Sequence, residues 1–360
     1  MESKSNNAAA DSDGAYGTTA PLEPRRNFLR SAAAGAAIAG FPAIVRAQSQ
    51  KRFLRPIVAG LNAKQGDPTF NSIANISKIL REKYDVLMEV QVHPSSALGT
   101  DISQLEAVQT GFIDITSNVT AQFSTFSKAF DFIDLPYAIT NWDMGLRLFK
   151  SDLWRRAAAR FEQEVPALKV LPPVGAGGYR LLWNTKRALR NAPNDVNGLK
   201  FRTTNSQLEI ALIRAWGGNP SPLAWTETYN GLKNGVVDGI HVQPIWTYSF
   251  NMHEVLKFAT AVDAIFAVQF QVLNRATWNA MPAPMQKAFM SAAQDAADQA
   301  NNEDRTQESQ FTQKLKDAKM EVYVPPAAEK KAWQATGEAL WNTVGKDIDR
   351  GFIKDMIALR

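Results

Sequence analysis

The segment GLKNGVVD at residues 231–238 repeats the pattern of AVQTGFID at residues 107–114. Each segment contains the end of an expected helix, a glycine that stops it, two apolar strand residues and an aspartate. A helix followed by glycine and a strand is a common arrangement, so chance similarity stays an alternative at this point. Together with the alternation of strands and helices around it, the repeat predicts two lobes of similar topology.

Expected strands and helices alternate before each copy of this pattern. Pro68 after Asp67 is typical of the first position of a helix, and the apolar spacing that follows continues it to about Tyr84. A strand–helix–strand order implies parallel strands joined by crossover helices. The other elements expected around the two copies are strands at 53–61, 86–92, 112–115 and 199–203 and helices at 102–110 and 206–216.

The C-terminal part contains an unusually long uninterrupted helical pattern. Residues 284–318 are polar and rich in Gln and Ala, with no glycine and no proline after Pro284. As one helix they would span roughly 50 Å at about 1.5 Å per residue, which exceeds one small lobe. The sequence therefore predicts an α/β protein with two lobes and a helix across both. The predicted boundaries are 48–176 with 270–310 for the first lobe and 177–269 with 311–360 for the second, and the GAGG segment at 175–178 favours a hinge.

The composition excludes several classes of protein. The chain has 360 residues, 45% of them hydrophobic, which is enough for two packed domains and unlike a disordered chain. It has no cysteine, so disulfides, Cys-ligated metals and thiol catalysis are excluded, and its three histidines lack metal-ligand spacing. The net charge of +5 is scattered rather than clustered, unlike a nucleic-acid binder. No motif for a nucleophilic, phosphate-binding or metal-dependent enzyme is present, and we expect no cofactor or metal.

The first 47 residues are expected to be a twin-arginine export signal. The motif RRNFLR at 25–30 precedes a weakly apolar stretch at 31–45 and the small-residue end VRA at 45–47. The stretch is too short and too rich in glycine for a helix that spans a membrane. We therefore expect cleavage near Ala47 and a soluble periplasmic product.

Two arginines lie in apolar, strand-like segments. Arg180 lies within GYRLLW at 178–183, and Arg202 ends GLKFR at 198–202. A buried arginine needs an anion, either an internal carboxylate or a bound ligand, because an unpaired buried charge is costly. A guanidinium matches a carboxylate in two-point geometry. The tryptophans nearby are expected either in an apolar binding slot or in the core; these are Trp183, Trp225 and Trp246.

The chain resembles the solute-binding proteins of TRAP (tripartite ATP-independent periplasmic) transporters, the DctP-like family. The resemblance extends over roughly residues 53–350. Its most specific stretches are GNPSPL at 218–223 and YNGLKNGVVDG at 229–239, and other matching blocks are HPSSALG at 93–99, DLPY at 134–137 and GLKFR at 198–202. The resemblance implies a two-lobed venus-flytrap receptor that closes on an organic acid and delivers it to the small and large permease subunits.

The resemblance also implies roles for individual residues. Arg202 would form the salt bridge with the ligand carboxylate, Arg180 would assist it, and Trp225 would place an aromatic ring against the ligand. Asn62 and Asn118 fall where the first lobe offers polar groups. The sequence departs from the family at IHVQP, residues 240–244, so that Gln243 is only a candidate.

The function expected from these features is non-catalytic capture of a carboxylate. Trp183 and Trp246 favour an aromatic or a keto or hydroxy acid, although a sugar acid also stacks on tryptophan and a dicarboxylate could use Arg180 as a second cation. The alternatives are an exported enzyme that acts on a small organic acid and a ligand-sensing component of a signalling system.

Overall fold

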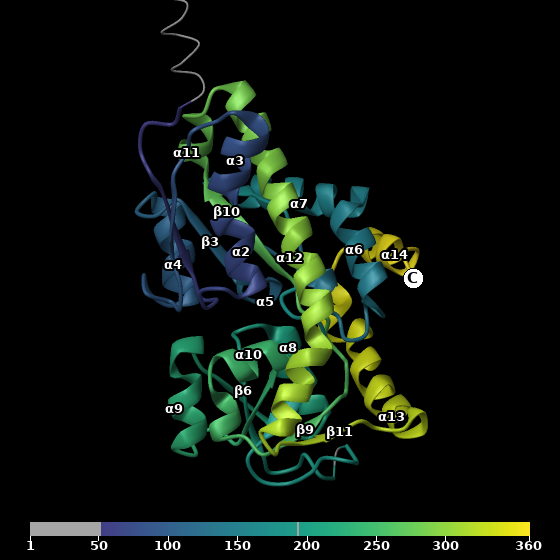
Figure 1. Cartoon of the computed structure of the whole chain (residues 1–360). Helices are drawn as coiled ribbons and strands as arrows, with labels where there is room; N and C mark the ends of the chain where they lie inside the picture. The colour runs from purple at the N-terminus through teal and green to yellow at the C-terminus, as the bar shows by residue number, and fades with distance from the viewer. Residues whose placement is uncertain (1–51, 193) are drawn as a thin grey trace, which may run out of the picture. The chain divides into compact units, whose positions relative to one another are not determined.

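A computed structural model describes residues 52–192 and 194–360 of the chain. The export signal predicted at residues 1–47 lies outside these described residues. The described strands form a five-stranded sheet of order β2-β1-β3-β10-β4 and a six-stranded sheet of order β11-β9-β5-β8-β6-β7 (Figure 1). The body around the five-stranded sheet is called lobe I, and the body around the six-stranded sheet is called lobe II.

The two sheets share a common core topology. In lobe I, β1 is parallel to both β2 and β3, and β10 is antiparallel to β3. In lobe II, β6 is parallel to both β7 and β8, and β5 is antiparallel to β8. The predicted α/β fold with two similar lobes is therefore confirmed. The strands are β1 (Ile57–Leu61), β2 (Val90–His93), β3 (Ile115–Val119), β4 (Leu168–Val170), β5 (Leu181–Asn184), β6 (Lys200–Thr203), β7 (Asn219–Pro222), β8 (Gly239–Val242), β9 (Phe258–Thr260), β10 (Gln269–Asn274) and β11 (Glu321–Tyr323).

Helices surround both sheets. Pro68 begins α2 as expected, but the helix predicted to reach Tyr84 is two helices, because α2 ends at Ala74 and α3 begins at Ile76. The helices are α2 (Pro68–Ala74), α3 (Ile76–Tyr84), α4 (Asp101–Thr110), α5 (Thr120–Phe123), α6 (Trp142–Lys150), α7 (Asp152–Glu164), α8 (Gln207–Ala215), α9 (Thr228–Lys233), α10 (Pro244–Ser249), α11 (Arg275–Asn279), α12 (Ala283–Asp317), α13 (Ala327–Glu338) and α14 (Arg350–Ile357), with short 3-10 turns at Asp131–Asp134, Trp225–Glu227, Met252–Glu254, Ala339–Asn342 and Val344–Asp347.

The aspartates of the repeated pattern have the same structural role in both lobes. The carboxylate of Asp114 accepts a hydrogen bond from the backbone N–H of Val58 at 2.9 Å, beside the start of β1. The carboxylate of Asp238 accepts one from the N–H of Lys200 at 2.9 Å, at the start of β6. Each aspartate thus ties the strand that follows it to the parallel strand beside it, β3 to β1 in lobe I and β8 to β6 in lobe II. The sequence repeat therefore corresponds to a structural repeat.

The strands that follow the two glycines begin later than predicted. Gly111 and Gly235 both have positive φ, which ends the preceding helix in the conformation that glycine favours. Phe112 and Val236, expected as strand residues, are exposed, and only the next apolar residue in each copy is buried. Strands β3 and β8 start directly after the aspartates. Each strand therefore begins three residues later than predicted, at Ile115 and Gly239.

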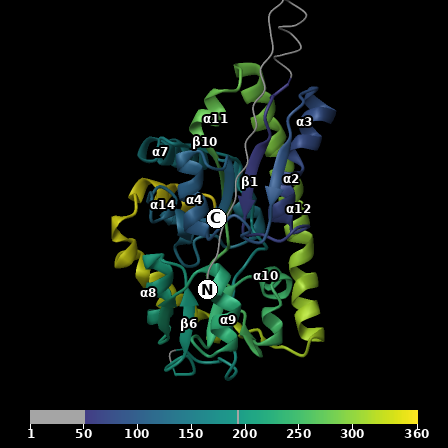
Figure 2. The same cartoon turned by 90° about the vertical axis from the view of Figure 1, so that its left-hand side faces the viewer.

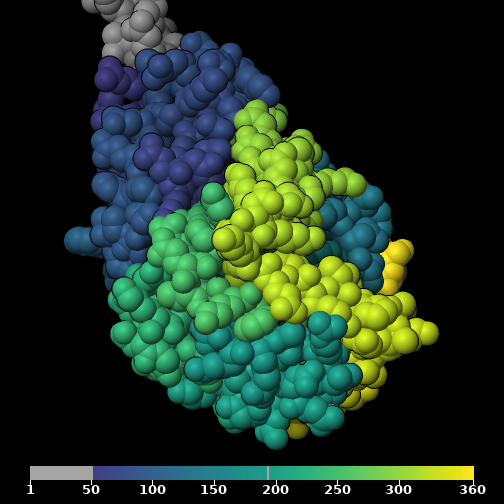
Figure 3. Space-filling model, turned by 60° about the horizontal axis from the view of Figure 1, so that its bottom comes forward, coloured from purple at the N-terminus to yellow at the C-terminus, as the bar shows by residue number. Residues whose placement is uncertain are grey.

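Helix α12 connects the two lobes as the sequence predicts. It has 35 residues and packs against α2 and α3 of lobe I and against α10 of lobe II (Figures 1 and 2). Small buried side chains at Ala292, Ala296 and Ala300 recur every four residues, which lets this helix approach its neighbours closely. Figure 3 shows α12 and the C-terminal residues as a continuous band beside the surfaces of both lobes.

The chain crosses between the sheets in the segment 171–180, which joins β4 to β5 and contains the GAGG motif. Asn301 of α12 holds this segment, because it accepts from the N–H of Gly175 at 2.8 Å and donates to the carbonyl of Pro173 at 3.2 Å. A second segment, 261–268, runs antiparallel to the first and leads into β10. Two crossing segments of this kind beside a long helix are suited to a hinge.

The C-terminal helix α14 packs against α7 of lobe I, and Phe352 joins a cluster of buried rings there. The lobe boundaries, including residues 311–360 for the second lobe, stay a prediction. Among the described residues, none of the helices combines the length and the apolar character that a membrane span requires.

Candidate functional site

A small cavity of about 40 Å³ lies between the two lobes. Residues next to the carboxyl ends of parallel strands line it, which is the usual position of a ligand site in an α/β protein. Asn62 follows β1, Thr204 follows β6 and Gln243 follows β8. The complete lining is Asn62, Asp101, Val119, Arg180, Arg202, Thr204, Trp225, His241, Val242, Gln243, Trp246 and Gln269.

Arg202 presents a buried cation to this cavity. Its side chain lies on β6, and its Nε donates to the carbonyl of Leu223 at 2.9 Å. The guanidinium carbon lies 5.6 Å from the ring centre of Trp225, within the range of a cation–π contact. Burial lowers the pKa of Arg202, and no carboxylate of the described residues lies within ion-pair distance of it. The arrangement therefore leaves the guanidinium able to bind an anion in the cavity.

Arg180 lines the same cavity but already has an internal partner. Its Nη1 lies 3.1 Å from Oε1 of Glu209, and both side chains are buried. The other oxygen of Glu209 accepts from the backbone N–H of Thr204 at 2.9 Å and from its hydroxyl at 2.5 Å. Burial raises the pKa of Glu209, but the charges of Arg180 and Arg202 and these hydrogen bonds outweigh it and hold the pKa below its usual value. For Arg180, the internal salt bridge that the sequence left open as an alternative is present, and its Nε remains buried without a partner.

Trp225 and Trp246 form the apolar part of the lining. Their rings meet edge to face at 5.2 Å, and Phe250 packs against both. Both tryptophans are almost fully buried, and the indole Nε1 of Trp225 has no hydrogen-bond partner in the structure. The pair thus offers an aromatic wall with one unused donor.

The other predicted residues divide into those at the cavity and those behind it. Asn62 and Gln243 line the cavity, and Gln243 donates through Nε2 to the carbonyl of Ala176 at 2.8 Å in the crossing segment. Trp183 does not line it: the ring is fully buried in lobe II, and Nε1 donates to the carbonyl of Val242 at 2.7 Å. Asn118 lies one residue from the lining residue Val119 and donates to the backbone carbonyl of Asp101 at 3.4 Å.

Two titratable residues of the lining, Asp101 and His241, were not predicted from the sequence. Asp101 is the first residue of α4, where an acidic side chain is ordinarily explained by the helix dipole, so its residue type gave no signal. His241 lies in the segment that departs from the family pattern, and this departure was the available signal. Burial, together with the charge of Arg180, lowers the pKa of His241 to about 3, so the imidazole is neutral at pH 7.

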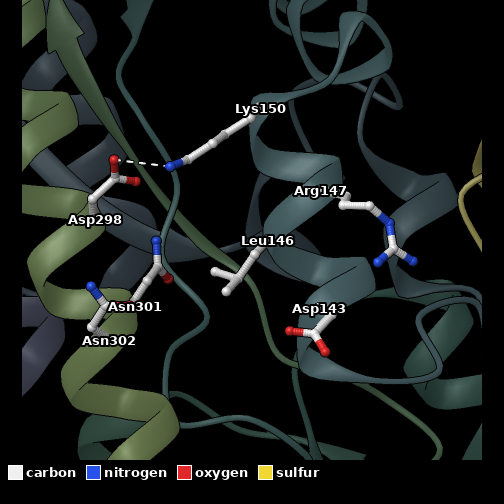
Figure 4. A pocket seen from close by; sticks show the side chains of 7 residues that line it. All are labelled: Asp143, Leu146, Arg147, Lys150, Asp298, Asn301 and Asn302. Carbon is white, nitrogen blue, oxygen red and sulfur yellow. Dashed lines mark hydrogen bonds and ion pairs between the residues drawn. The ribbon is translucent and has the colours of Figure 1, made fainter.

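Larger hollows lie elsewhere on the surface but lack such groups. One of about 670 Å³ lies between α6 and α12, where Lys150 and Asp298 form an ion pair at 3.0 Å (Figure 4). Its charged side chains are largely exposed, so they are hydrated without a ligand. Within the described ranges, no group of three or more His, Asp or Glu side chains is arranged to hold a metal ion. The buried arginines make the interlobe cavity the better candidate despite its small volume.

Comparisons with known proteins agree with this fold. Among curated proteins, the chain is 25% identical to the 2,3-diketo-L-gulonate-binding periplasmic protein YiaO of Escherichia coli, over 90% of this chain and 96% of that protein. It is also 25% identical to the C4-dicarboxylate-binding periplasmic protein DctP of Rhodobacter capsulatus, over 83% of this chain and 89% of that protein.

A solved structure and a family model give the same result. The crystal structure of a TRAP periplasmic solute-binding protein from Chromohalobacter salexigens, with bound D-glucuronate, matches the fold with a TM-score of 0.78. The match covers 84% of this chain and 99% of that chain at 23% sequence identity. The model of the bacterial extracellular solute-binding protein family 7, DctP, matches residues 59–347. This chain therefore belongs to the DctP family of bacterial extracellular solute-binding proteins.

Proposed function

We propose that this protein is the receptor of a TRAP transporter and that it captures an organic acid between its lobes. The observation that carries the proposal is Arg202, a buried cation that faces the interlobe cavity and has no carboxylate partner among the described residues. A ligand carboxylate would supply the missing anion in two-point geometry. The relatives named above bind a diketogulonate, C4-dicarboxylates or D-glucuronate, all of which carry a carboxylate.

The remaining lining residues have complementary roles in this proposal. Arg180 lies beside the carboxylate, Trp225 and Trp246 contact the body of the ligand, and Asn62 offers a polar group from lobe I. Gln243 contacts the crossing segment and the cavity together, which would link ligand binding to lobe position. Because both lobes line the cavity, a ligand there stabilises the closed arrangement by its differential affinity for it.

In the cell, the protein would deliver its ligand rather than catalyse a reaction on it. The curated relatives named above are described as periplasmic binding proteins. We propose that residues 1–47 direct twin-arginine export with cleavage near Ala47, and that the mature receptor passes its ligand to the small and large permease subunits without changing it.

Calorimetric titration with organic acids, together with the variant Arg202→Ala, tests the function. The unmodified protein should bind at least one acid and gain thermal stability, by about 2.7 kcal/mol at a ligand concentration one hundred times Kd. Arg202→Ala should lose this binding while its circular dichroism spectrum stays native. Arg214→Ala is the matched control, because Arg214 is exposed on α8 in the same lobe. Full affinity in Arg202→Ala would refute the assignment of the site.

A further inference from the structure

The lobe I side of the cavity presents mostly hydrogen-bond acceptors. Asp101 accepts through Oδ1 from Nδ2 of Asn62 and through Oδ2 from Nε2 of Gln122, each at 3.1 Å. Burial raises the pKa of Asp101, whereas the charge of Arg202 and the hydrogen bonds from these two amides favour its ionised form. An ionised carboxylate only accepts, so both amides turn their nitrogens toward it. Their oxygens are consequently left without donors: Oδ1 of Asn62 and Oε1 of Gln122 are buried and have no partner among the residues that the structure describes.

A third amide and the carboxylate itself extend this set of acceptors. Asn118 directs its Nδ2 to the backbone carbonyl of Asp101, and its Oδ1 is also buried without a partner. Each carboxylate oxygen of Asp101 accepts one hydrogen bond in the structure, and each can accept a second. Unsatisfied buried acceptors are costly, so Oδ1 of Asn62 and the carboxylate of Asp101, which belong to lining residues, indicate hydrogens that come from a ligand. Gln122 lines a neighbouring cavity, and Asn118 lies behind the lining.

The lobe II side presents mostly donors. Nε of Arg180 and Nε1 of Trp225 are buried without partners, and Arg202 has a single described hydrogen bond. Two groups do not follow this division. Gln269 of β10 has a free Nε2 on the lobe I side, and the neutral His241 offers one donor and one acceptor. The cavity is therefore polarised, with cations on one wall and a carboxylate on the other.

We propose that Asp101 is a specificity-determining residue that selects a monocarboxylate carrying hydroxyl groups, with the ligand carboxylate at Arg202 and its hydroxyls at Asp101. This inference rests on the proposed function, because it assumes that the ligand is an organic acid held by Arg202. A hydroxyl can both donate and accept a hydrogen bond. It can therefore donate to the acceptors around Asp101 and pair with either ring nitrogen of His241.

Other classes of acid fit this wall less well. A second carboxylate would lie against Asp101, and two like charges in a closed site repel each other strongly. An unsubstituted hydrocarbon tail would leave the oxygens of Asn62 and Gln122 desolvated and unsatisfied. An ammonium group would satisfy Asp101 but would leave the N–H donor of His241 without an acceptor, because an ammonium only donates.

A second cavity gives this ligand room to extend. It has a volume of about 180 Å³ and shares Asp101, Thr204 and Trp225 with the first. Its lining includes Gln122 and Glu227 but no lysine or arginine. A longer hydroxylated ligand can enter it past Asp101, whereas a second carboxylate would find no cation there.

A matched panel of acids tests the proposal on the unmodified protein. Calorimetry compares four classes at four and six carbons: threonate and gluconate, butanoate and hexanoate, succinate and adipate, and 4-aminobutanoate and 6-aminohexanoate, with glucuronate as a cyclic hydroxylated acid. The tightest hydroxylated acid should bind at least tenfold more tightly than any other class. Tighter or equal binding of a plain, dicarboxylic or amino acid would overturn the assignment.

The variant Asp101→Asn tests the residue itself. It should weaken the binding of the best hydroxylated acid at least tenfold. It should also reduce the difference in affinity between this acid and succinate, because the negative charge that repels a second carboxylate is removed. Asp347→Asn, at an exposed aspartate, should change neither affinity. Unchanged selectivity in Asp101→Asn would overturn the role of Asp101 while leaving the receptor function intact. If no acid binds at all, the proposed function fails, and Arg202→Ala then has no affinity to lose.

Discussion

Arg180 and Glu209 form a buried ion pair within lobe II, with Nη1 of the arginine 3.1 Å from Oε1 of the carboxylate. The charge of Arg180 is thus balanced before any ligand arrives, whereas Arg202 has no such partner among the described residues. The two arginines of the cavity are therefore not equivalent. The geometry makes Arg202 the primary anion site and makes Arg180 a residue whose position depends on Glu209.

Glu209→Gln should destabilise the folded protein strongly. The substitution keeps the size of the side chain but removes the ion-pair partner of the buried Arg180, which costs about 3 kcal/mol. Urea unfolding monitored by tryptophan fluorescence measures this loss at pH 7. Glu106→Gln, at an exposed position on α4, is the control and should unfold like the unmodified protein. If Glu209→Gln lost no more unfolding free energy than this control, the buried charge of Arg180 would not need the negative charge of Glu209.

Asp134 should make the stability of the protein depend on pH near neutrality. Burial raises the pKa of Asp134 to about 7, although Arg180 and a 2.6 Å hydrogen bond from Thr120 lower it. A folded-state pKa above the usual value of about 3.9 means that the folded protein holds this proton more tightly than the unfolded chain. The contribution to stability is therefore complete below about pH 4 and is lost as the pH rises to about 7.

The variant Asp134→Asn should remove this dependence, because the amide does not titrate. Between pH 5 and pH 7, the free energy of unfolding of the unmodified protein should fall relative to that of the variant by at most about 1.4 kcal/mol per pH unit. Asp131 lies nearby and burial raises its pKa to about 6, but it is present in both proteins and largely cancels in the comparison. Parallel pH profiles for the two proteins would contradict the prediction.

The fold was predictable because its signals are local. Helix-ending glycines, strand periodicity and a 35-residue helical run, in which the single proline lies in the first turn, indicate their elements without knowledge of distant partners. The errors at Phe112 and Val236 arose because an apolar residue after a glycine has the same type whether it is exposed or begins a strand. Burial at such positions depends on packing against other elements, which a local pattern does not contain.

The candidate site was predictable in part, for a related reason. Arg180 and Arg202 were conspicuous because charged residues in apolar strands require an explanation, and the family resemblance indicated Trp225. Asp101 and Glu209 were not conspicuous, because acidic residues in the first turn of a helix are common on protein surfaces. The folded structure is needed to show that Asp101 lines the interlobe cavity and that Glu209 pairs with Arg180.

Gly178 of the crossing segment should resist replacement by alanine. Its φ is +82°, and an added Cβ would lie 2.5 Å from Oε1 of Glu308 on α12. Glu308 accepts from the N–H of Tyr179 at 3.1 Å and from Nε1 of Trp142 at 2.6 Å, so it cannot move away without breaking these bonds. Gly178→Ala therefore combines backbone strain with a clash where α12 holds the crossing segment.

Gly198→Ala separates these two effects, because Gly198 also has a φ of +82° but an added Cβ there would have no other atom within 4 Å. Backbone strain should cost each variant about 1 kcal/mol, and Gly178→Ala should lose about 1–3 kcal/mol more through the clash. Urea unfolding measures both costs. Stopped-flow tryptophan fluorescence should show slower ligand-induced closure in Gly178→Ala alone, since only that substitution disturbs the contact between Glu308 and the crossing segment. Equal stability and equal closure rates in the two variants would show that this contact does not control the hinge.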